Sequence, residues 1–581
     1  MRKSGIYALA DRGGAPLDRA DVDALGLTPR EPIPAQMFEA VDPRAPGQLF
    51  RLDDADGTTL VSGELADLPA LAGRLGMAAG LPPAQVARAA LERFGVQLPA
   101  ELIGEWSLLH CDPDGGITLV QSAARRDPIL YALSGRKIAV APTIASLARI
   151  SWVGTEIDPV GLLGKLGRPS ARAQADDRTM VARVRQLLPG ETVHIAPDGS
   201  IRRQRARLFD VIPQWRGTLA DAAAEAEELL LHVLADHTAR SPRIAGLLSG
   251  GLDSSLLAWA AAQSAGEGSR PIFVTSVSPT RTGIPDESAE ARLVADYLGC
   301  EWLPVAPPED ANPYRPAESL LHGDVGPSLS NRQEVTLSIQ HAAQAAGATA
   351  LMNGTYGESS FTLLSHPGRF ATPSPLRRLA RSLRSMLNPP EPLNHSPFHV
   401  RLAKHRMDNL DPAFLAPVPQ DPLDAVRRDG RLGYLAGARK GMMLANEVQP
   451  GALRMLFPYR DMRLLRLFAG FPRSVLAETG GDREPARMIL DGRLPDAIRL
   501  RRSGLPASPG HMARLKRHAP AAHARIAAFR KAGVDDWLDL DWLDTALMQL
   551  AASGTNSVIF ANEVQLTSMT AEFLLWWNSG H

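Results

Sequence analysis

Short apolar runs alternate with Gly, Pro and Asp turns through about the first 210 residues. Residues 104–112 and 116–120 are two such runs, and each is bounded by turn residues and has the length of a strand. The pattern predicts a β-rich N-terminal part.

The pattern changes at about residue 218, where helical and strand-like segments begin to alternate. The predicted helices are residues 222–233, 254–265, 287–298 and 334–346. The predicted strands are residues 244–248, 271–277, 302–305 and 348–352. Such alternation favours a parallel, doubly wound sheet, in which ligands bind at the carboxyl ends of the strands.

The most informative stretch begins in the first of these strands and reads Leu247-Leu248-Ser249-Gly250-Gly251-Leu252-Asp253-Ser254-Ser255. Its glycines allow the backbone to approach an anion, and the amides that open the following helix add donors, as do its serines. It is not a Walker A loop, because it lacks Gly-Lys-Ser/Thr. We predict a pyrophosphate-binding loop at which ATP is split between its α and β phosphates. The candidate nucleotide contacts are Leu248, Ser249, Gly250, Gly251, Leu252, Asp253, Ser254 and Ser255.

Two carboxylates are candidate metal ligands. Asp253 would repel a phosphate unless a divalent cation lay between them, so it predicts Mg²⁺. A second strand followed by a glycine turn, residues 350–361, carries Glu358. A glutamate in such a loop is usually only solvated. Glu358 becomes a candidate second Mg²⁺ ligand only as the partner of Asp253. Thr275 and Ser276, near the end of a predicted strand, are further candidate nucleotide contacts.

Composition excludes several classes of protein. The 63 Lys and Arg residues balance the 63 Asp and Glu residues, so net charge gives no argument for a nucleic-acid or membrane partner. The two cysteines are too few for a disulfide framework or a cysteine-rich metal site. A chain of 581 residues is expected to form two or more domains. We recognise neither a signal peptide nor a membrane-spanning stretch and therefore expect a cytoplasmic protein.

Further motifs lie at residues 102–107, 126–131, 186–191, 353–354, 458–461 and 492–501. With these and residues 249–255, the chain resembles the asparagine synthetase B superfamily. The resemblance implies a degenerate class II glutamine amidotransferase-like domain at residues 1–210, an α+β sandwich of the Ntn type. It implies an ATP-pyrophosphatase domain at residues 218–581, an α/β doubly wound parallel sheet with a helical C-terminal part. ATP and Mg²⁺ are the cofactors it implies, and Asn353 and Gly354 are nucleotide contacts that it implies.

The chain departs from this superfamily at the glutaminase nucleophile. Glutamine-dependent members begin Met-Cys-Gly-Ile, whereas here Ser4-Gly5-Ile6 stands in the equivalent stretch and no cysteine precedes Cys111. A serine there lacks the thiolate and the free amine that activates it. We therefore expect a vestigial glutaminase, with the amino nucleophile supplied by the substrate itself.

Two kinds of family member use such a nucleophile, β-lactam synthetases and lasso peptide cyclases. The family lysine that stabilises the adenylation transition state is missing from residues 499–506. Arg501 or Arg502 is the candidate replacement. An equally good interpretation is that both arginines belong to a surface turn without a role in catalysis. Tyr356 lies near the first position of the Tyr-Glu dyad of β-lactam synthetases, but Arg454 stands about where the glutamate would fall. These details favour a lasso peptide cyclase, which adenylates an Asp or Glu side chain and joins it to the peptide's N-terminal amine.

Other functions stay open at this point. The chain is also compatible with a β-lactam synthetase or an ammonia-dependent, asparagine synthetase-like amide ligase. A non-catalytic peptide-binding scaffold is a further alternative, because Thr355, Glu358 and Ser359 depart from the usual acidic run. The resemblance to cyclases implies a precursor peptide, a leader peptidase and a leader-recognition protein as partners, with no nucleic acid and no membrane.

Overall fold

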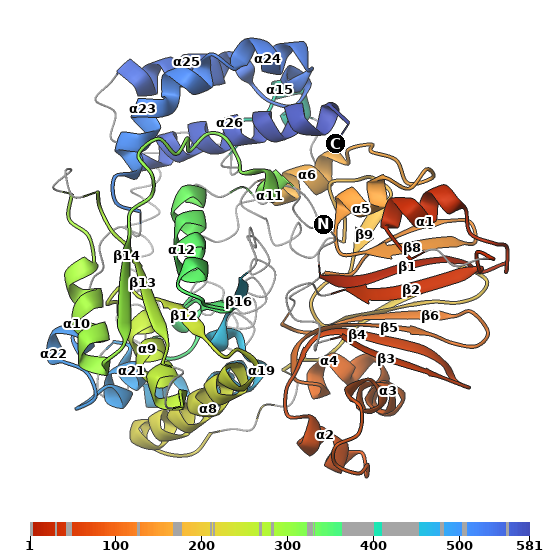
Figure 1. Ribbon diagram of the computed structural model, residues 1–581, viewed down its shortest axis with the longest axis horizontal. Coiled ribbons are helices and arrows are strands. Elements are labelled where there is room, and N and C mark those ends of the chain that lie inside the picture. Colours follow the sequence, from red (N-terminus) through yellow and green to blue (C-terminus); the bar gives the residue numbers. More distant parts are fainter. Residues whose placement is uncertain are drawn as a thin grey trace, which may run out of the picture.

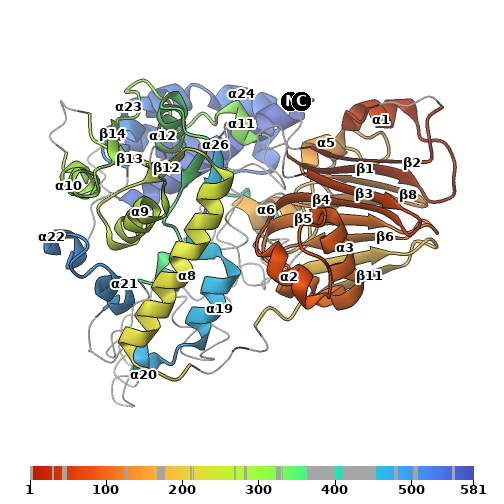
Figure 2. The same ribbon diagram turned by 60° about the horizontal axis from the view of Figure 1, so that its bottom comes forward.

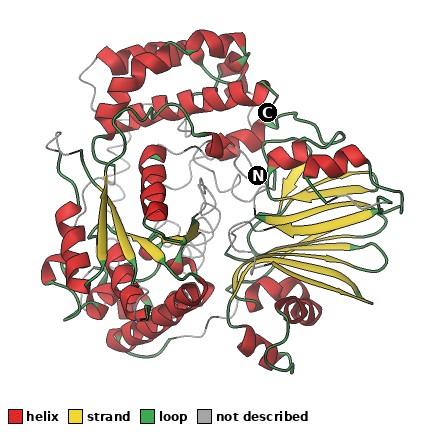
Figure 3. Cartoon of the chain, viewed as in Figure 1, coloured by secondary structure: helices red, strands yellow, loops and turns green. Residues whose placement is uncertain are grey.

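The computed structural model describes residues 4–28, 32–41, 49–124, 128–166, 177–209, 212, 215–266, 270–279, 284–321, 329, 332–362, 400–408, 453–476, 482–501, 508–552 and 557–580. Two antiparallel sheets stack face to face in the N-terminal part, and a parallel sheet with helices forms the next part (Figures 1 and 3). A helical layer built largely from the C-terminal residues completes the molecule.

The N-terminal sheets form a sandwich. One sheet has the strand order β2-β1-β8-β7-β9 and the other the order β11-β10-β6-β5-β4-β3. The strands of the first are β1 (Gly5–Asp11), β2 (Gln36–Val41), β7 (Leu130–Ser134), β8 (Lys137–Ala141) and β9 (Val184–Gln186). Those of the second are β3 (Leu49–Asp54), β4 (Gly57–Leu65), β5 (Gly104–Cys111), β6 (Ile117–Gln121), β10 (Glu191–Ile195) and β11 (Ile201–Arg205). Alternate residues such as Ile6, Ala8 and Ala10 of β1 fill the core between the sheets, as the period of a strand requires.

Helices cover both outer faces of the sandwich. On the six-stranded sheet lie α2 (Leu68–Arg74), α3 (Pro83–Phe94) and α4 (Leu98–Glu101), which pack around Trp106. On the other sheet lie α1 (Arg19–Leu25), α5 (Ile144–Ala148) and α6 (Pro159–Leu166). The core beneath them continues into α23 (His511–His523), α24 (Ile526–Lys531), α25 (Leu540–Ala552) and α26 (Val558–Asn578). One polar contact there is the indole of Trp577, which donates to the carbonyl of Thr155 at 3.2 Å.

The third sheet is parallel, with the order β14-β13-β12-β15-β16. Its strands are β12 (Ile244–Leu247), β13 (Ile272–Ser276), β14 (Glu301–Val305), β15 (Ala350–Met352) and β16 (Arg454–Leu456). Phe273 packs with α8 (Leu219–Arg240), α9 (Leu252–Ser264) and α10 (Ser288–Leu298), whereas Ile272 and Val274 pack with α12 (Gln333–Ala345). Helices therefore cover both faces, and α19 (Met462–Gly470) lies beside α8 (Figure 2).

The predicted fold class is confirmed: an antiparallel sandwich precedes a parallel sheet and a helical C-terminal part. Most predicted elements differ from the observed ones by one or two residues at an end, as with α10 and α12. The first helix is longer than predicted, because Thr218 and Asp221 form a capping box and the helix then continues to Arg240, shortly before Pro242. Among the described helices, none is long and apolar enough to cross a bilayer.

Candidate functional site

The order of the parallel strands reverses between β12 and β15. β13 and β14 lie on one side of β12, and β15 and β16 lie on the other. In doubly wound folds such a reversal opens a crevice at the carboxyl ends of the strands, where ligands bind. The two glycine turns predicted from the sequence, residues 248–251 and 353–357, follow these two strands and therefore meet at this edge.

The β12–α9 loop, residues 248–251, is held in one conformation by short-range hydrogen bonds. The Oγ atoms of Ser249 and Ser254 lie 3.0 Å apart, and Ser254 Oγ donates to the Gly251 carbonyl at 3.1 Å. Gly250 has a φ of +66°, and a Cβ there would lie 2.9 Å from the backbone carbonyl carbon of Glu290. Only glycine fits this position, because both the backbone conformation and the close approach of α10 exclude a side chain.

Thr275 supports the loop from β13. Its hydroxyl donates to the Leu248 carbonyl at 2.7 Å and accepts from the Trp302 indole at 2.9 Å. The neighbouring Ser276 differs, because its Oγ is buried and has no hydrogen-bond partner among the described residues. Ser255 Oγ in α9 is likewise buried and has no hydrogen-bond partner among the described residues. Buried hydroxyls of this kind normally meet a water or a ligand, so both are candidate contacts for a bound molecule.

Asp253 lies in the first turn of α9 and faces the turn that follows β15. Its Oδ1 accepts a hydrogen bond from Thr362 and lies so close to Gly357 that a Cβ on this glycine would clash with it. The pKa of Asp253 is raised to about 6, chiefly by burial; the hydrogen bond from Thr362 and the positive charge of Arg483 lower it, and the negative charge of Glu358 raises it. A bound cation would stabilise the ionised form of such a carboxylate.

The turn after β15 carries the other predicted residues. The Asn353 side chain accepts from Thr355 N at 2.9 Å, which folds the amide back onto its own turn. Gly354 packs against α9, since a Cβ there would lie 3.4 Å from Ser254 Cα. Tyr356 has a φ of +82°, and its ring centroid lies 6.1 Å from that of Phe457. A tyrosine held at positive φ is strained, and such strain concentrates at functional sites.

Asp253 and Glu358 suit Mg²⁺, which prefers carboxylate oxygens and keeps several waters. Glu358, in the short turn Gly357–Ser359, is exposed and therefore accessible to a hydrated ion. Elsewhere in the described residues, Asp67, His232 and Asp236 form a group of three possible ligands. There, however, the Arg463 guanidinium pairs with both carboxylates at 2.7 and 2.9 Å and already occupies them.

Arg501 contacts both the β12–α9 loop and the start of α10. Its Nη1 donates to the Ser249 carbonyl at 3.1 Å, and its Nη2 lies 3.3 Å from Glu287 and 3.6 Å from Glu290. Arg487 in turn donates to the Arg501 carbonyl at 3.3 Å. These contacts make Arg501 a candidate positioning residue for the loop. The other candidate, Arg502, lies outside the described residues.

We expect Arg501→Ala to raise the KM for ATP about tenfold with a smaller effect on kcat, because the loop loses a charged hydrogen bond. Steady-state kinetics of pyrophosphate release would measure both constants. Arg499→Ala is the matched control, since Arg499 pairs with the exposed Asp496 at 2.8 Å. A large fall in kcat at unchanged KM would instead assign Arg501 to the transition state.

Three residues around Asp253 could not be identified from the sequence. Thr362 donates to its carboxylate, and the buried Tyr459 donates to its backbone carbonyl at 2.8 Å. Arg483 has a φ of +60°, and its Nε is buried with no partner among the described residues. The positive charge of Arg483 is near enough to lower the pKa of Asp253. A cation beside this carboxylate is a candidate contact for a phosphate.

The pKa of Asp253 predicts how Mg²⁺ and pH act together. The pKa is raised from 3.8 to about 6, so its contribution to stability is full below about pH 4 and is lost as the pH rises through 6. Bound Mg²⁺ favours the ionised carboxylate. Thermal unfolding should therefore show a larger stabilisation by Mg²⁺ with a non-hydrolysable ATP analogue at about pH 7.5 than at about pH 5. An equal stabilisation by Mg²⁺ at both pH values would contradict the placement of the ion at Asp253.

Neither cysteine resembles an activated nucleophile. Burial raises the pKa of Cys111 to about 11, and burial also raises the pKa of Cys300. Ser4, at the position where the sequence comparison expected the glutaminase cysteine, is buried and follows three other residues. The described part of the sandwich therefore offers no cysteine thiolate for releasing ammonia from glutamine.

Arg454 lies far from the chemistry suggested for the equivalent glutamate. It begins β16, opposite the start of β15, and so lies at the other end of these strands from the two turns. Its guanidinium pairs with Glu64 of β4 and donates to Ser241 Oγ at 2.5 Å. Arg454 therefore links the parallel sheet to the sandwich.

Comparisons with known proteins give a family match for part of the chain. Residues 225–405 match the asparagine synthase family. Two solved structures align with 61% of the chain at low similarity. They are glutamine phosphoribosylpyrophosphate amidotransferase from B. subtilis with ADP and GMP (12% identity, TM-score 0.22, 76% of that chain) and an allosteric regulatory enzyme of purine biosynthesis (14%, 0.24, 84%). No curated protein matches the chain. The chain thus contains an asparagine synthase-type domain, the domain of ATP-dependent amide ligases.

Proposed function

We propose that this protein is an ATP-dependent lasso peptide cyclase, which adenylates an Asp or Glu side chain of a precursor peptide and closes a macrolactam with its N-terminal amine. The observation that carries the proposal is the meeting of the turn after β15 with the Asp253 carboxylate, beside the β12–α9 loop at the strand reversal. The buried Ser4 adds to it, because a chain without a glutaminase nucleophile needs an amine from its substrate. A leader peptidase and a leader-recognition protein are the partners that such a reaction requires.

Different residues of the chain would bind the phosphates of ATP and the Mg²⁺ ion. The amides of the β12–α9 loop and of the first turn of α9 would bind the β and γ phosphates, and Arg483 would add positive charge. Ser255 and Ser276 offer hydroxyls without partners among the described residues. Asp253 and Glu358 would hold Mg²⁺, which supplies charge neutralisation when it is bound.

The chemistry then proceeds in two steps. An oxygen of the substrate carboxylate attacks the α-phosphorus, the bond from this phosphorus to the bridging oxygen breaks, and pyrophosphate leaves. The amine of the same peptide next attacks the acyl carbon, and AMP leaves with the carboxylate oxygen as the amine loses a proton. Tyr356 is the candidate base, because it lies in the turn beside Asp253. Holding the amine against the acyl group would supply much of the rate, since intramolecular reactions reach effective molarities of about 10⁵ M or more.

Product analysis tests the proposal. The protein is incubated with ATP, Mg²⁺ and, in parallel, aspartate with ammonia, a β-amino acid, and the precursor peptide encoded beside its gene. We expect AMP and pyrophosphate with the peptide alone, together with the loss of one water from the peptide mass. With the carboxylate labelled by ¹⁸O, one labelled oxygen should appear in AMP, because the carboxylate attacks phosphorus.

The other outcomes assign other functions. AMP with aspartate and ammonia would make the protein an asparagine synthetase-like ligase, and AMP with the β-amino acid would make it a β-lactam synthetase. ADP in place of AMP would contradict adenylation. Binding of ATP and peptide without turnover would leave a peptide-binding scaffold.

A further inference from the structure

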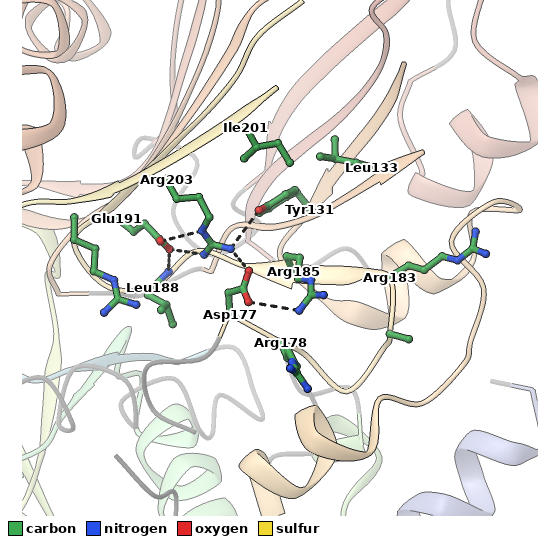
Figure 4. Close-up of a pocket in the computed structure, with 12 residues that line it drawn as sticks. Tyr131, Leu133, Asp177, Arg178, Arg183, Arg185, Leu188, Glu191, Ile201 and Arg203 are labelled. Carbon is green, nitrogen blue, oxygen red and sulfur yellow. Dashed lines mark hydrogen bonds and ion pairs between the residues drawn. The ribbon is translucent and has the colours of Figure 1, made fainter. Parts of the chain in front are cut away.

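A cavity of about 1190 Å³ lies in the N-terminal sandwich, away from the parallel sheet. It opens between the inner faces of the two sheets, where β11, the edge strand of one sheet, faces β7 and the edge strand β9 of the other (Figure 4). Tyr131 and Leu133 of β7 form part of its wall, and residues 177–183 close one side. Among the described strands, none closes the sandwich along this side.

The wall of this cavity carries an excess of positive charge. Its five arginines are Arg178, Arg183, Arg185, Arg203 and Arg205, and its two carboxylates are Asp177 and Glu191. The chain as a whole has equal numbers of acidic and basic residues, so the excess is local. Arginine binds carboxylates and phosphates through two parallel hydrogen bonds, which makes such a wall suited to anions.

Two of these arginines stand where a sandwich normally has apolar residues. Residues 191, 193 and 195 of β10 pair with residues 205, 203 and 201 of β11. Val193 and Ile195 belong to the core between the sheets, so Arg203 and Arg205 project from the same inner face. Sandwich interiors are apolar. A departure of this kind from the local pattern is expected where a residue serves function rather than stability.

Both carboxylates of the wall engage Arg203. Its Nη2 lies 2.9 Å from Glu191, and its Nη1 pairs with Asp177 and lies 3.5 Å from the Tyr131 hydroxyl. Asp177 also lies 3.5 Å from Arg185. Figure 4 shows these side chains gathered at the centre of the cavity, with Arg183 set apart at its far side. The network fixes one guanidinium rigidly and leaves the wall with more cations than anions.

We propose that this cavity binds an acidic segment of the peptide substrate and so anchors it outside the reaction centre. The volume exceeds the range of roughly 300–1,000 Å³ of small-molecule sites and suits several residues of an extended chain. β11 is the edge of its sheet, and an open edge offers backbone groups with which an extended peptide can pair. The identification of the ligand as a substrate rests on the proposed function, whereas its acidic character rests on the wall alone.

Fluorescence anisotropy with a fluorescein-labelled hexaglutamate peptide and the full-length protein tests the proposal. We expect salt-sensitive binding that falls at least about tenfold in the double variant Arg185→Gln/Arg205→Gln, because two charged hydrogen bonds are lost. Arg19→Gln removes an exposed arginine of the same sandwich, which pairs with Asp23 at 3.3 Å, and should bind as the wild type does. Thermal unfolding of each variant would verify that it is folded.

The proposal would be overturned by no binding to the folded wild type, by equal binding to the double variant, or by equal binding of a labelled hexaglutamine peptide. Displacement of hexaglutamate by inorganic phosphate at a lower concentration than by unlabelled hexaglutamate would also overturn it, since the site would then recognise phosphate. Asp253→Asn should leave this binding unchanged, so the cavity and the adenylation site are tested separately. With a peptide that is cyclised, the double variant should raise KM and preserve kcat.

Discussion

Replacing Asp253 by asparagine is expected to lower the rate of pyrophosphate release by about a thousandfold or more, because the side chain keeps its shape but loses the charge that holds Mg²⁺. Its carboxylate is the only one in the first turn of α9, and it faces the turn that carries Glu358. A coupled pyrophosphate assay at saturating ATP would measure the loss.

The control for this variant is Asp296→Asn. Asp296 lies on the neighbouring helix α10 and pairs with Arg292 at 3.4 Å, and both side chains are about two-thirds exposed. We expect it to keep the wild-type rate, since exposed ion pairs contribute little. Asp253→Asn should bind an ATP analogue without a response to Mg²⁺. Undiminished pyrophosphate release by Asp253→Asn would remove Asp253 from the metal site.

Replacing Glu64 by glutamine is expected to lower the free energy of unfolding by about 3–5 kcal/mol, because it leaves buried cations without their anion. Glu64 is 3% exposed, and it pairs with Arg454, with Arg240 at 3.0 Å and with His237 at 3.6 Å. These three partners belong to the parallel-sheet region, so the carboxylate joins the two parts of the molecule. Chemical denaturation followed by tryptophan fluorescence would measure the change.

The double variant Glu64→Gln/Arg454→Met should recover part of the loss, since it removes the buried charge on both sides. Asp23→Asn is the surface control, because Asp23 and its partner Arg19 are more than half exposed. Since the chain has several cores, the unfolding of Glu64→Gln is expected to separate into two transitions. A single transition at the wild-type midpoint would show that this carboxylate does not couple the two parts. Turnover below the first transition should remain that of the wild type, because Arg454 lies away from the two turns.

Much of the fold was predictable, because its signals are local. Strands such as β5 and β13 follow from short apolar runs, and α9 and α12 from helical composition bounded by turns. The ends of elements were less predictable, as α8 illustrates. Its capping box and its final turns near the sandwich lie beyond the apolar repeat that predicted it.

The candidate site was predictable only in part. Residues 248–255 form a contiguous loop and helix start, so their chemistry could be interpreted from their order along the chain. Thr362 and Arg483 follow Asp253 by more than 100 positions, and no motif marks either. Arg501 was one of two arginines proposed to stabilise charge on the α-phosphate. The structure places its side chain near Glu287 and the loop carbonyl, and its effect on catalysis stays a prediction.

By itself, the sequence determined that a β-rich part precedes a part with alternating strands and helices, and it predicted the glycine loop at residues 248–251, because apolar periods and glycine turns are properties of adjacent residues. Only the tertiary structure decided which charged groups meet. Packing brings the turn after β15 onto Asp253, Glu64 onto Arg454, and the arginines of β9 and β11 around one cavity. These contacts join segments that are distant in the chain, and they depend on how the elements stack rather than on any local pattern.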